Sequence, residues 1–80
     1  MQTKTIEELI ETQIKCQHVQ VDSEDLRHYT AVIVSDDFQG KPKIQRHRLV
    51  YGALGDYMHA EIHAFSFQAY TPEEYSNLKK

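Results

Sequence analysis

The sequence contains 80 residues, of which 26% are charged and 40% hydrophobic, and its formal net charge is −3. A chain of this length forms one domain with a thin core, because it buries only about 60 to 65% of its unfolded surface. We therefore expect residues 1–80 to form a single soluble domain whose function lies on its surface. The negative charge argues weakly against a general nucleic-acid coat protein, because such a protein needs lysine and arginine to displace counterions.

The composition also excludes several structural classes. Cys16 is the only cysteine, which excludes an internal disulfide and an all-cysteine metal site, and we expect its thiol to be buried. No apolar run approaches the roughly 20 residues that span a bilayer, and no signal-like segment opens the sequence. These features predict a cytoplasmic protein that does not contact a membrane.

An amphipathic helix is predicted over residues 5–15. Thr5 and Glu8 have the spacing of a capping box. Apolar residues follow at helical intervals, namely Ile6, Leu9, Ile10 and Ile14. The acidic side chains of this helix are expected to face solvent.

Two strands joined by a short turn are predicted next. Val19 and Val21 alternate with polar neighbours in the first strand, and residues 28–35 are the run richest in β-forming residues. Residues 22–25 are acidic and polar and form the turn between them. Because this connection is short, the two strands should be antiparallel.

Two helices are predicted in the middle of the chain. Pro42 suits the first turn of a helix over residues 43–52, and a shorter helix should follow over residues 53–60, separated from it by glycines. Gly52-Ala-Leu-Gly55 matches the GxxG pattern with which KH modules clamp a nucleic-acid backbone. Its two middle residues are apolar, which favours a helix with a buried leucine over a nucleic-acid loop.

A third strand and a last helix complete the chain. In the strand over residues 62–70, one set of alternating side chains should be buried, with a histidine at its rim: His63, Phe65, Phe67 and Ala69. Thr71, Pro72 and Glu74 form a strong helix start, and Tyr70 and Tyr75 are placed as a hydrophobic staple. The resulting order, helix, strand, strand, helix, helix, strand, helix, predicts an α+β fold.

The predicted topology brings two distant histidines to one edge of the sheet. A crossover through two helices makes the second and third strands parallel if they are neighbours, so His28 and His63 would both lie at strand starts on the same edge. Imidazole binds zinc or iron and can replace cysteine on one iron of a two-iron cluster. The spacing alone favours a second interpretation, in which both are half-exposed edge histidines without a ligand.

A cationic segment lies between these histidines. Four of the nine basic residues fall within eight positions that contain no acid, and a histidine accompanies them, so we predict a face for a partner or a nucleic acid: Lys41, Lys43, Arg46, His47 and Arg48. The alternative is a solvated helix face. His47 precedes Tyr51 by four residues, so the two side chains should be neighbours on the helix. No nucleophile elbow, phosphate loop or pair of carboxylates in an apolar setting is found, so we do not expect an enzyme.

Taken together, these residues resemble the BolA-like protein family. The resemblance covers nearly the whole chain and rests on a combination of motifs: Phe38-x-Gly40, Arg46-His47-Arg48-x-Val50-Tyr51, Leu54, Ile62-His63-Ala64 and Thr71-Pro72-x-Glu74. The short first turn and residues 69–75 are similar to the shorter bacterial branch, called YrbA-like or IbaG-like. The resemblance implies a class II KH-like αββααβα fold, with a three-stranded mixed sheet and a helix-turn-helix-like pair of central helices.

The resemblance also implies a role in the assembly or trafficking of iron–sulfur clusters. Members of the family pair with monothiol glutaredoxins of the CGFS type and share a bridging [2Fe-2S] cluster, for which His63 and the loop residue His28 would be the ligands. The glutaredoxin cysteine and a glutathione thiol would complete the coordination. No cofactor is therefore expected in the isolated chain, which should be a monomer or weak homodimer. The acids before His28 are expected to weaken delivery of an anionic cluster: Asp22, Glu24 and Asp25.

The family suggests one alternative from another functional class. Some relatives are described as stress-responsive DNA-binding regulators of cell shape and envelope, for which the basic helix would be the contact face. In the leading hypothesis, the same helix is part of the glutaredoxin-binding face.

Overall fold

The computed structural model describes residues 2–55, 57 and 64–78. In chain order its elements are α1 (Thr3–Gln13), β1 (Cys16–Asp22), β2 (His28–Ser35), a 3-10 turn η1 (Asp36–Phe38), α2 (Lys43–Leu54), β3 (Ala64–Tyr70) and α4 (Pro72–Leu78). The predicted α+β fold is confirmed. In this part of the chain, no helix is long and apolar enough to cross a bilayer.

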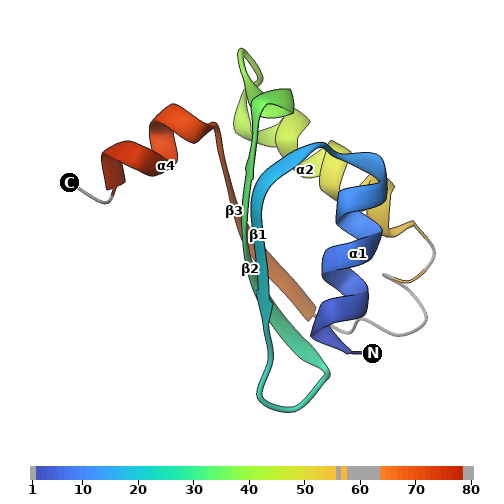
Figure 1. Cartoon of the computed structure of the whole chain (residues 1–80). Coiled ribbons are helices and arrows are strands. Elements are labelled where there is room, and N and C mark those ends of the chain that lie inside the picture. Colours follow the sequence, from blue (N-terminus) through green and yellow to red (C-terminus); the bar gives the residue numbers. More distant parts are fainter. Residues whose placement is uncertain (1, 56, 58–63, 79–80) are drawn as a thin grey trace.

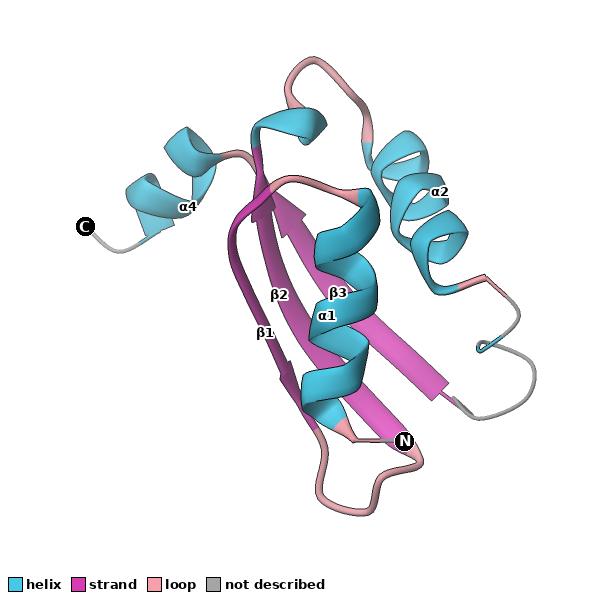
Figure 2. Ribbon diagram, turned by 45° about the vertical axis from the view of Figure 1, so that its right-hand side comes forward, coloured by secondary structure: helices cyan, strands magenta, loops and turns pink. Residues whose placement is uncertain are grey.

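The three strands form one mixed sheet in the order β1-β2-β3 (Figure 2). β1 pairs with β2 in the antiparallel sense, and β2 pairs with β3 in the parallel sense. Both orientations were predicted from the lengths of the connections. In the parallel pair, His28 lies opposite Ala64, so the starts of β2 and β3 meet at one edge of the sheet.

The core lies between one face of the sheet and two helices. Figure 1 shows α1 and α2 on the same side of the sheet, whereas α4 projects from the other side. Apolar residues from α1, the strands, η1 and α2 form one cluster, including Ile10, Ile33, Phe38, Val50 and Leu54. β3 contributes Phe67 to this face, and Ser66 and Gln68 are exposed, as the alternation predicted.

The predicted start of the first helix is wrong. α1 begins at Thr3, and its N-cap is Gln2, which makes no side-chain capping bond, so Thr5 lies inside the first turn. Burial of Ile6 and Ile10 against the sheet fixes the helix, and this packing outweighs the local capping signal. One predicted outward acid also turns inward, because Glu7 Oε2 accepts a hydrogen bond from the Val21 N–H at 2.9 Å.

The middle helix is longer than predicted. α2 continues through Gly52 to Leu54, which is buried, and the chain leaves the helix at Gly55 with φ 54°. A glycine suits that left-handed conformation. The first three residues of the GxxG pattern therefore lie within a helix, and its last glycine is the C-cap. Half of the predicted helix over residues 53–60 and the predicted strand start at residues 62 and 63 lie outside the described residues.

The predicted start of the last helix is confirmed. Thr71 Oγ1 accepts from the Glu74 N–H at 3.2 Å, and the Thr71 N–H donates to Glu74 Oε1 at 2.9 Å, which is the reciprocal pattern of a capping box. The rings of Tyr70 and Tyr75 are 6.1 Å apart, in the place of the predicted staple. On its far side, Tyr75 stacks on His18 at 5.4 Å, so this helix is docked by aromatic contacts to the sheet face that α1 and α2 leave uncovered.

Candidate functional site

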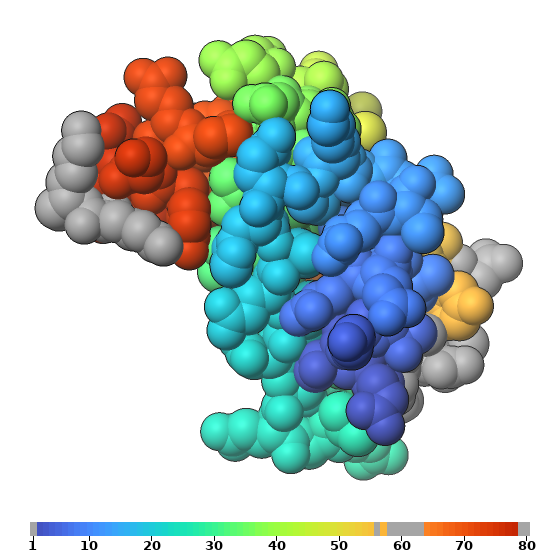
Figure 3. Space-filling view, in the orientation of Figure 1, coloured from blue at the N-terminus to red at the C-terminus, as the bar shows by residue number. Residues whose placement is uncertain are grey.

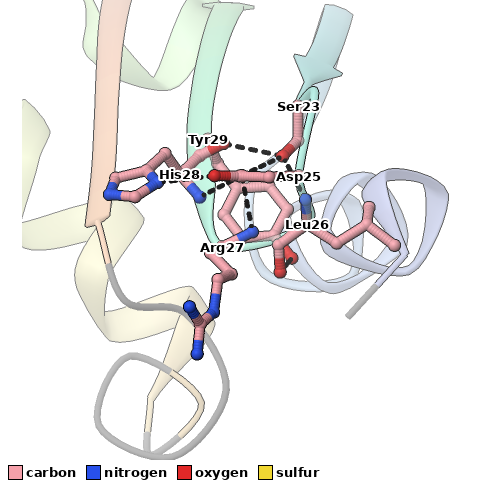
Figure 4. A network of polar contacts seen from close by, with 6 residues as sticks. All are labelled: Ser23, Asp25, Leu26, Arg27, His28 and Tyr29. Carbon is pink, nitrogen blue, oxygen red and sulfur yellow. Dashed lines mark hydrogen bonds and ion pairs between the residues drawn. The ribbon is translucent and has the colours of Figure 1, made fainter.

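The loop between β1 and β2 is closed by its own polar groups. Ser23 Oγ donates to the His28 carbonyl at 2.7 Å and accepts from the Leu26 N–H at 2.8 Å. The Tyr29 hydroxyl donates to the Leu26 carbonyl at 2.8 Å, and Leu26 has a φ of 57°, unusual for a leucine. Figure 4 shows these bonds converging from both sides of the loop, which projects from the bottom of the molecule in Figure 3. The backbone that leads into β2 is therefore held in one conformation.

Asp25 binds both the backbone and the side chain of this loop. Its Oδ1 accepts from the Arg27 and His28 N–H groups, each at 3.0 Å, and its Oδ2 lies 2.9 Å from His28 Nδ1. The His28 and Asp25 side chains are 72% and 50% exposed. The hydrogen bonds from the His28 N–H, the His28 ring and the Arg27 N–H hold the pKa of Asp25 well below its usual range. The carboxylate is therefore ionised at neutral pH.

His28 stands at the rim of a shallow hollow on the sheet edge. The hollow has a volume of about 450 Å³ and is lined by residues of the loop and by the starts of β2 and β3, including Asp22, Glu24, Asp25, His28, Ala64 and Ser66. The Ala64 N–H donates to the Arg27 carbonyl at 3.2 Å, which ties β3 to the end of the loop. His63, the residue before Ala64, lies outside the described residues, so its role as a ligand stays a prediction.

The predicted cationic face lies at the other end of the sheet. A groove of about 450 Å³ runs between the start of α2, the end of β3 and α4, and its lining includes Lys41, Lys43, Arg46, His47 and Glu74. Tyr70, at the end of β3, pairs with Val34, six residues beyond His28. At about 3.3 Å per residue, the histidine edge and the cationic groove are separated by roughly 20 Å.

Arg46 is held inside the molecule by four hydrogen bonds. Its Nε donates to the Lys41 carbonyl at 2.8 Å, and its Nη1 donates to the Ala69 carbonyl at 2.9 Å and to Glu74 Oε1 at 2.7 Å. Nη2 donates to Glu74 Oε2 at 3.3 Å. Only 14% of the Arg46 side chain is exposed, and its guanidinium lies 5.9 Å from the centre of the Phe38 ring. This arginine joins α2, β3 and α4.

The carboxyl of Glu74 is tuned by the same contacts. The hydrogen bond from Arg46, followed by that from the Thr71 N–H, lowers the pKa of Glu74 from 4.5 to about 2. Glu74 remains 47% exposed, so solvent screens part of this attraction. At neutral pH the negative charge of Glu74 therefore neutralises the positive charge of Arg46, one of the predicted contact residues.

The other predicted contact residues are more accessible. Lys43 and Arg48 are exposed, and Lys41 is partly buried. His47 is partly buried against aromatic rings, 4.5 Å from Phe67 and 6.1 Å from Tyr51, which confirms that His47 and Tyr51 are neighbours. Lys43 and Arg48 are therefore better placed than Arg46 to contact a partner.

Cys16 is only partly buried, in contrast to the prediction of a buried thiol. Its Sγ donates to the Ile14 carbonyl at 3.3 Å. Burial and then the charges of Glu11 and Asp37 raise the pKa of Cys16 to about 11. The thiol is therefore protonated at neutral pH and is a poor nucleophile and metal ligand.

Two pairings in these sites were missed from the sequence. An aspartate three residues before a histidine is a turn signal, and Asp25 could have been identified by it as the partner of the His28 backbone. Glu74 and Arg46 are 28 positions apart and carry no local signal of contact. They meet only because the fold brings the start of α2 and the start of α4 together at the end of β3.

Comparison with known proteins identifies the family. The sequence profile described as BolA-like protein matches residues 2–74. The chain is 32% identical over 79 residues to BolA-like protein 2 of Mus musculus, which covers 94% of this chain and 91% of that protein. It is 35% identical over 52 residues to the DNA-binding transcriptional regulator BolA of Escherichia coli, which covers 65% of this chain and only 50% of that protein.

The fold is shared with solved structures of the same family. The BolA domain of SufE1 from Arabidopsis thaliana superposes with a TM-score of 0.81 at 34% identity, covering 90% of this chain and 93% of that domain. In the full-length SufE-like protein 1 of that plant, the matching stretch is 49% identical over 47 residues, which is 59% of this chain but 13% of that protein. Profile, sequence and fold agree, and the chain belongs to the BolA-like protein family.

Proposed function

We propose that this chain is a non-enzymatic accessory factor in iron–sulfur cluster assembly or trafficking, acting in the cytoplasm. In this role it forms a [2Fe-2S]-bridged complex with a CGFS-type monothiol glutaredoxin. Membership of the BolA-like family supports the proposal. The observation that carries it furthest is the placement of His28, which is exposed at the sheet edge directly opposite the residue that follows His63.

The donor chemistry at this edge fits a shared cluster. Imidazole nitrogen replaces cysteine sulfur on one iron of some two-iron clusters. His28 has one ring nitrogen on Asp25, which leaves Nε2 for a metal. Two imidazoles complete one iron at most, so the partner's cysteine and a glutathione thiol would hold the other.

Mixing the chain with a CGFS glutaredoxin, glutathione, iron and sulfide is expected to give a heterodimer. Its absorption and circular dichroism spectra should differ from those of the glutaredoxin homodimer, because imidazole replaces thiolate on one iron. His63→Ala should abolish the distinct spectrum and His28→Ala should weaken it. His18→Ala is a matched control, since His18 stacks on Tyr75 away from this edge. An unchanged spectrum for His63→Ala would show that the ligand assignment is wrong.

A second function is supported by the names of two relatives. The Escherichia coli and Haemophilus influenzae proteins are both called DNA-binding transcriptional regulator BolA, and the latter is 42% identical over 48 residues. In this chain, Lys43 and Arg48 are the exposed cations of α2, and Lys41 lines the groove beside them. These residues would contact phosphates if the chain binds DNA.

Lys43→Ala and Arg48→Ala are expected to weaken such DNA binding. Each lost phosphate contact should reduce the slope of log affinity against log salt by about one. The measurement is a fluorescence anisotropy titration at several salt concentrations, with Lys4→Ala as a control for an exposed lysine on another helix. Binding that is indifferent to both α2 substitutions would exclude the basic helix as a DNA contact. Arg46→Ala is unsuitable here because it also removes a structural contact.

A further inference from the structure

We propose that Asp25 is a positioning residue that fixes the tautomer and orientation of His28, so that Nε2 is the atom presented to a metal. The inference rests on the proposed function for the identity of the metal, because it specifies how one proposed ligand would be held. The sequence suggested only that the negative charge of Asp25 would disfavour an anionic cluster, whereas here its carboxylate orients the ligand.

The two oxygens of Asp25 have separate partners. Oδ1 is anchored by the backbone N–H groups of Arg27 and His28, each at 3.0 Å. With Oδ1 fixed, Oδ2 is directed at His28 Nδ1, 2.9 Å away. Figure 4 shows the Asp25 carboxylate between the His28 ring and the loop backbone, with the ring extending away from the loop.

The loop holds the backbone of His28 as firmly as Asp25 holds its ring. Ser23 Oγ bonds the His28 carbonyl and the Leu26 N–H, and the Tyr29 hydroxyl bonds the Leu26 carbonyl. These contacts keep Leu26 in a left-handed conformation, which a leucine adopts only when its surroundings impose it. The ligand position is therefore organised before any metal arrives.

A neutral imidazole carries one proton, and its location decides which nitrogen can bind a metal. With the proton on Nδ1, His28 donates to Oδ2 and leaves the Nε2 lone pair accessible. With the proton on Nε2, the lone pairs of Nδ1 and Oδ2 would face each other at 2.9 Å, which is repulsive. The carboxylate therefore selects the Nδ1–H tautomer, the opposite of the one that an unrestrained histidine prefers in water. Carboxylate–histidine–metal triads use this arrangement to orient their ligands.

Asp25→Asn should change the tautomer of His28 without changing the fold of the loop. The amide oxygen keeps the two backbone hydrogen bonds of Oδ1, but the amide nitrogen now presents an N–H to Nδ1. His28 must then accept at Nδ1 and carry its proton on Nε2, the atom needed for the metal. Glu24→Gln is the matched control. Glu24 lines the same hollow, and the substitution removes the same charge, but Glu24 takes part in none of these bonds.

Two measurements test the inference. In the metal-free chain, at a pH at which imidazole is neutral, long-range ¹H–¹⁵N spectra should show His28 as the Nδ1–H tautomer, switching to Nε2–H in Asp25→Asn only. In the second measurement, the chain is titrated into cluster-loaded CGFS glutaredoxin. There Asp25→Asn should need an about 10- to 100-fold higher concentration to form the mixed complex, and Glu24→Gln should need no higher concentration than the unmodified chain.

The outcomes distinguish this inference from the proposed function. An Nε2–H tautomer in the unmodified chain, or one that Asp25→Asn leaves unchanged, overturns the positioning role even if the mixed complex forms. A switched tautomer with unaltered complex formation overturns the link to ligation. If the unmodified chain forms no mixed complex at all, the proposed function fails, and the role of Asp25 toward a cluster fails with it, whatever the tautomer.

Discussion

Arg46→Ala is expected to lower the free energy of unfolding by about 2 to 3 kcal/mol, because hydrogen bonds to charged groups each contribute about 1.5 to 3 kcal/mol and losing one partner leaves others unsatisfied. Arg46 makes four such bonds and is 14% exposed. Its removal would leave the Lys41 and Ala69 carbonyls without this donor and Glu74 without its counter-ion. Urea unfolding followed by circular dichroism measures the loss.

Arg48→Ala is the matched control, since Arg48 is an exposed arginine on the same helix. Its cost should stay within about 0.5 kcal/mol, as for most surface substitutions. Arg46→Lys should recover only part of the stability, because an ammonium cannot make the two-pronged contact with Glu74. Equal stabilities for Arg46→Ala and Arg48→Ala would refute the structural role of Arg46.

The pH dependence of stability provides an independent measure of the same contact. The folded-state pKa of Glu74 is depressed from 4.5 to about 2. The stability contributed by this carboxylate is therefore fully present above about pH 4.5 and is lost as the pH falls toward 2. Without Arg46 the pKa of Glu74 should rise toward its ordinary value, so the difference in stability between Arg46→Ala and the unmodified chain should shrink across that range. A difference that stays constant with pH would contradict the ion pair.

The structural role of Arg46 changes how the basic segment, residues 41–48, is interpreted. The sequence places five candidate contact residues in one run, but the structure commits Arg46 to the α4 contact and packs His47 partly against Phe67. A loss of DNA or partner binding in Arg46→Ala would therefore mix recognition with stability. Lys43 and Arg48 are the residues from which recognition can be judged.

Local signals predicted the elements wherever they agreed with the packing. The reciprocal bonds of Thr71 and Glu74 and the strand over residues 28–35 follow from patterns that short segments contain. The parallel pairing follows from the length of the crossover between β2 and β3. The start of α1 did not follow, because contacts of Ile6 and Ile10 with the sheet decided it in place of the local capping signal.

Side-chain partners were harder to predict than elements. His28 could be placed at the sheet edge from strand order alone, but its bond to Asp25 depends on the conformation of a turn that includes a leucine with positive φ. Sequence patterns predict such a conformation for glycine or asparagine and not for leucine. From the sequence, the acids of this loop were therefore expected only to repel an anionic cluster. In the structure, one of them, Asp25, is the direct partner of His28.

Phe38→Ala is expected to have the largest effect on stability of any change described here, about 3 to 5 kcal/mol, since it removes a fully buried ring from the core. Phe38 ends the turn η1 after β2, and its carbonyl accepts from the Lys41 N–H at 3.1 Å. Its ring also lies beneath the Arg46 guanidinium. Its loss should loosen the loop that leads into α2, and urea unfolding measures the cost.

Two variants separate the packing of Phe38 from other effects. Phe38→Leu keeps most of the buried volume and should cost less than about 1.5 kcal/mol, whereas Ile44→Ala, at an exposed position of α2, should cost within about 0.5 kcal/mol. A cost below 1 kcal/mol for Phe38→Ala, on the scale of about 5 to 15 kcal/mol for a whole domain, would show that the ring is not part of the core. Because Phe38 lies at the end of the sheet away from His28, Phe38→Leu should leave the His28 tautomer and the formation of the mixed complex unchanged. A change in either would mean that the two ends of the sheet are coupled, and that the histidine edge depends on more than its own loop.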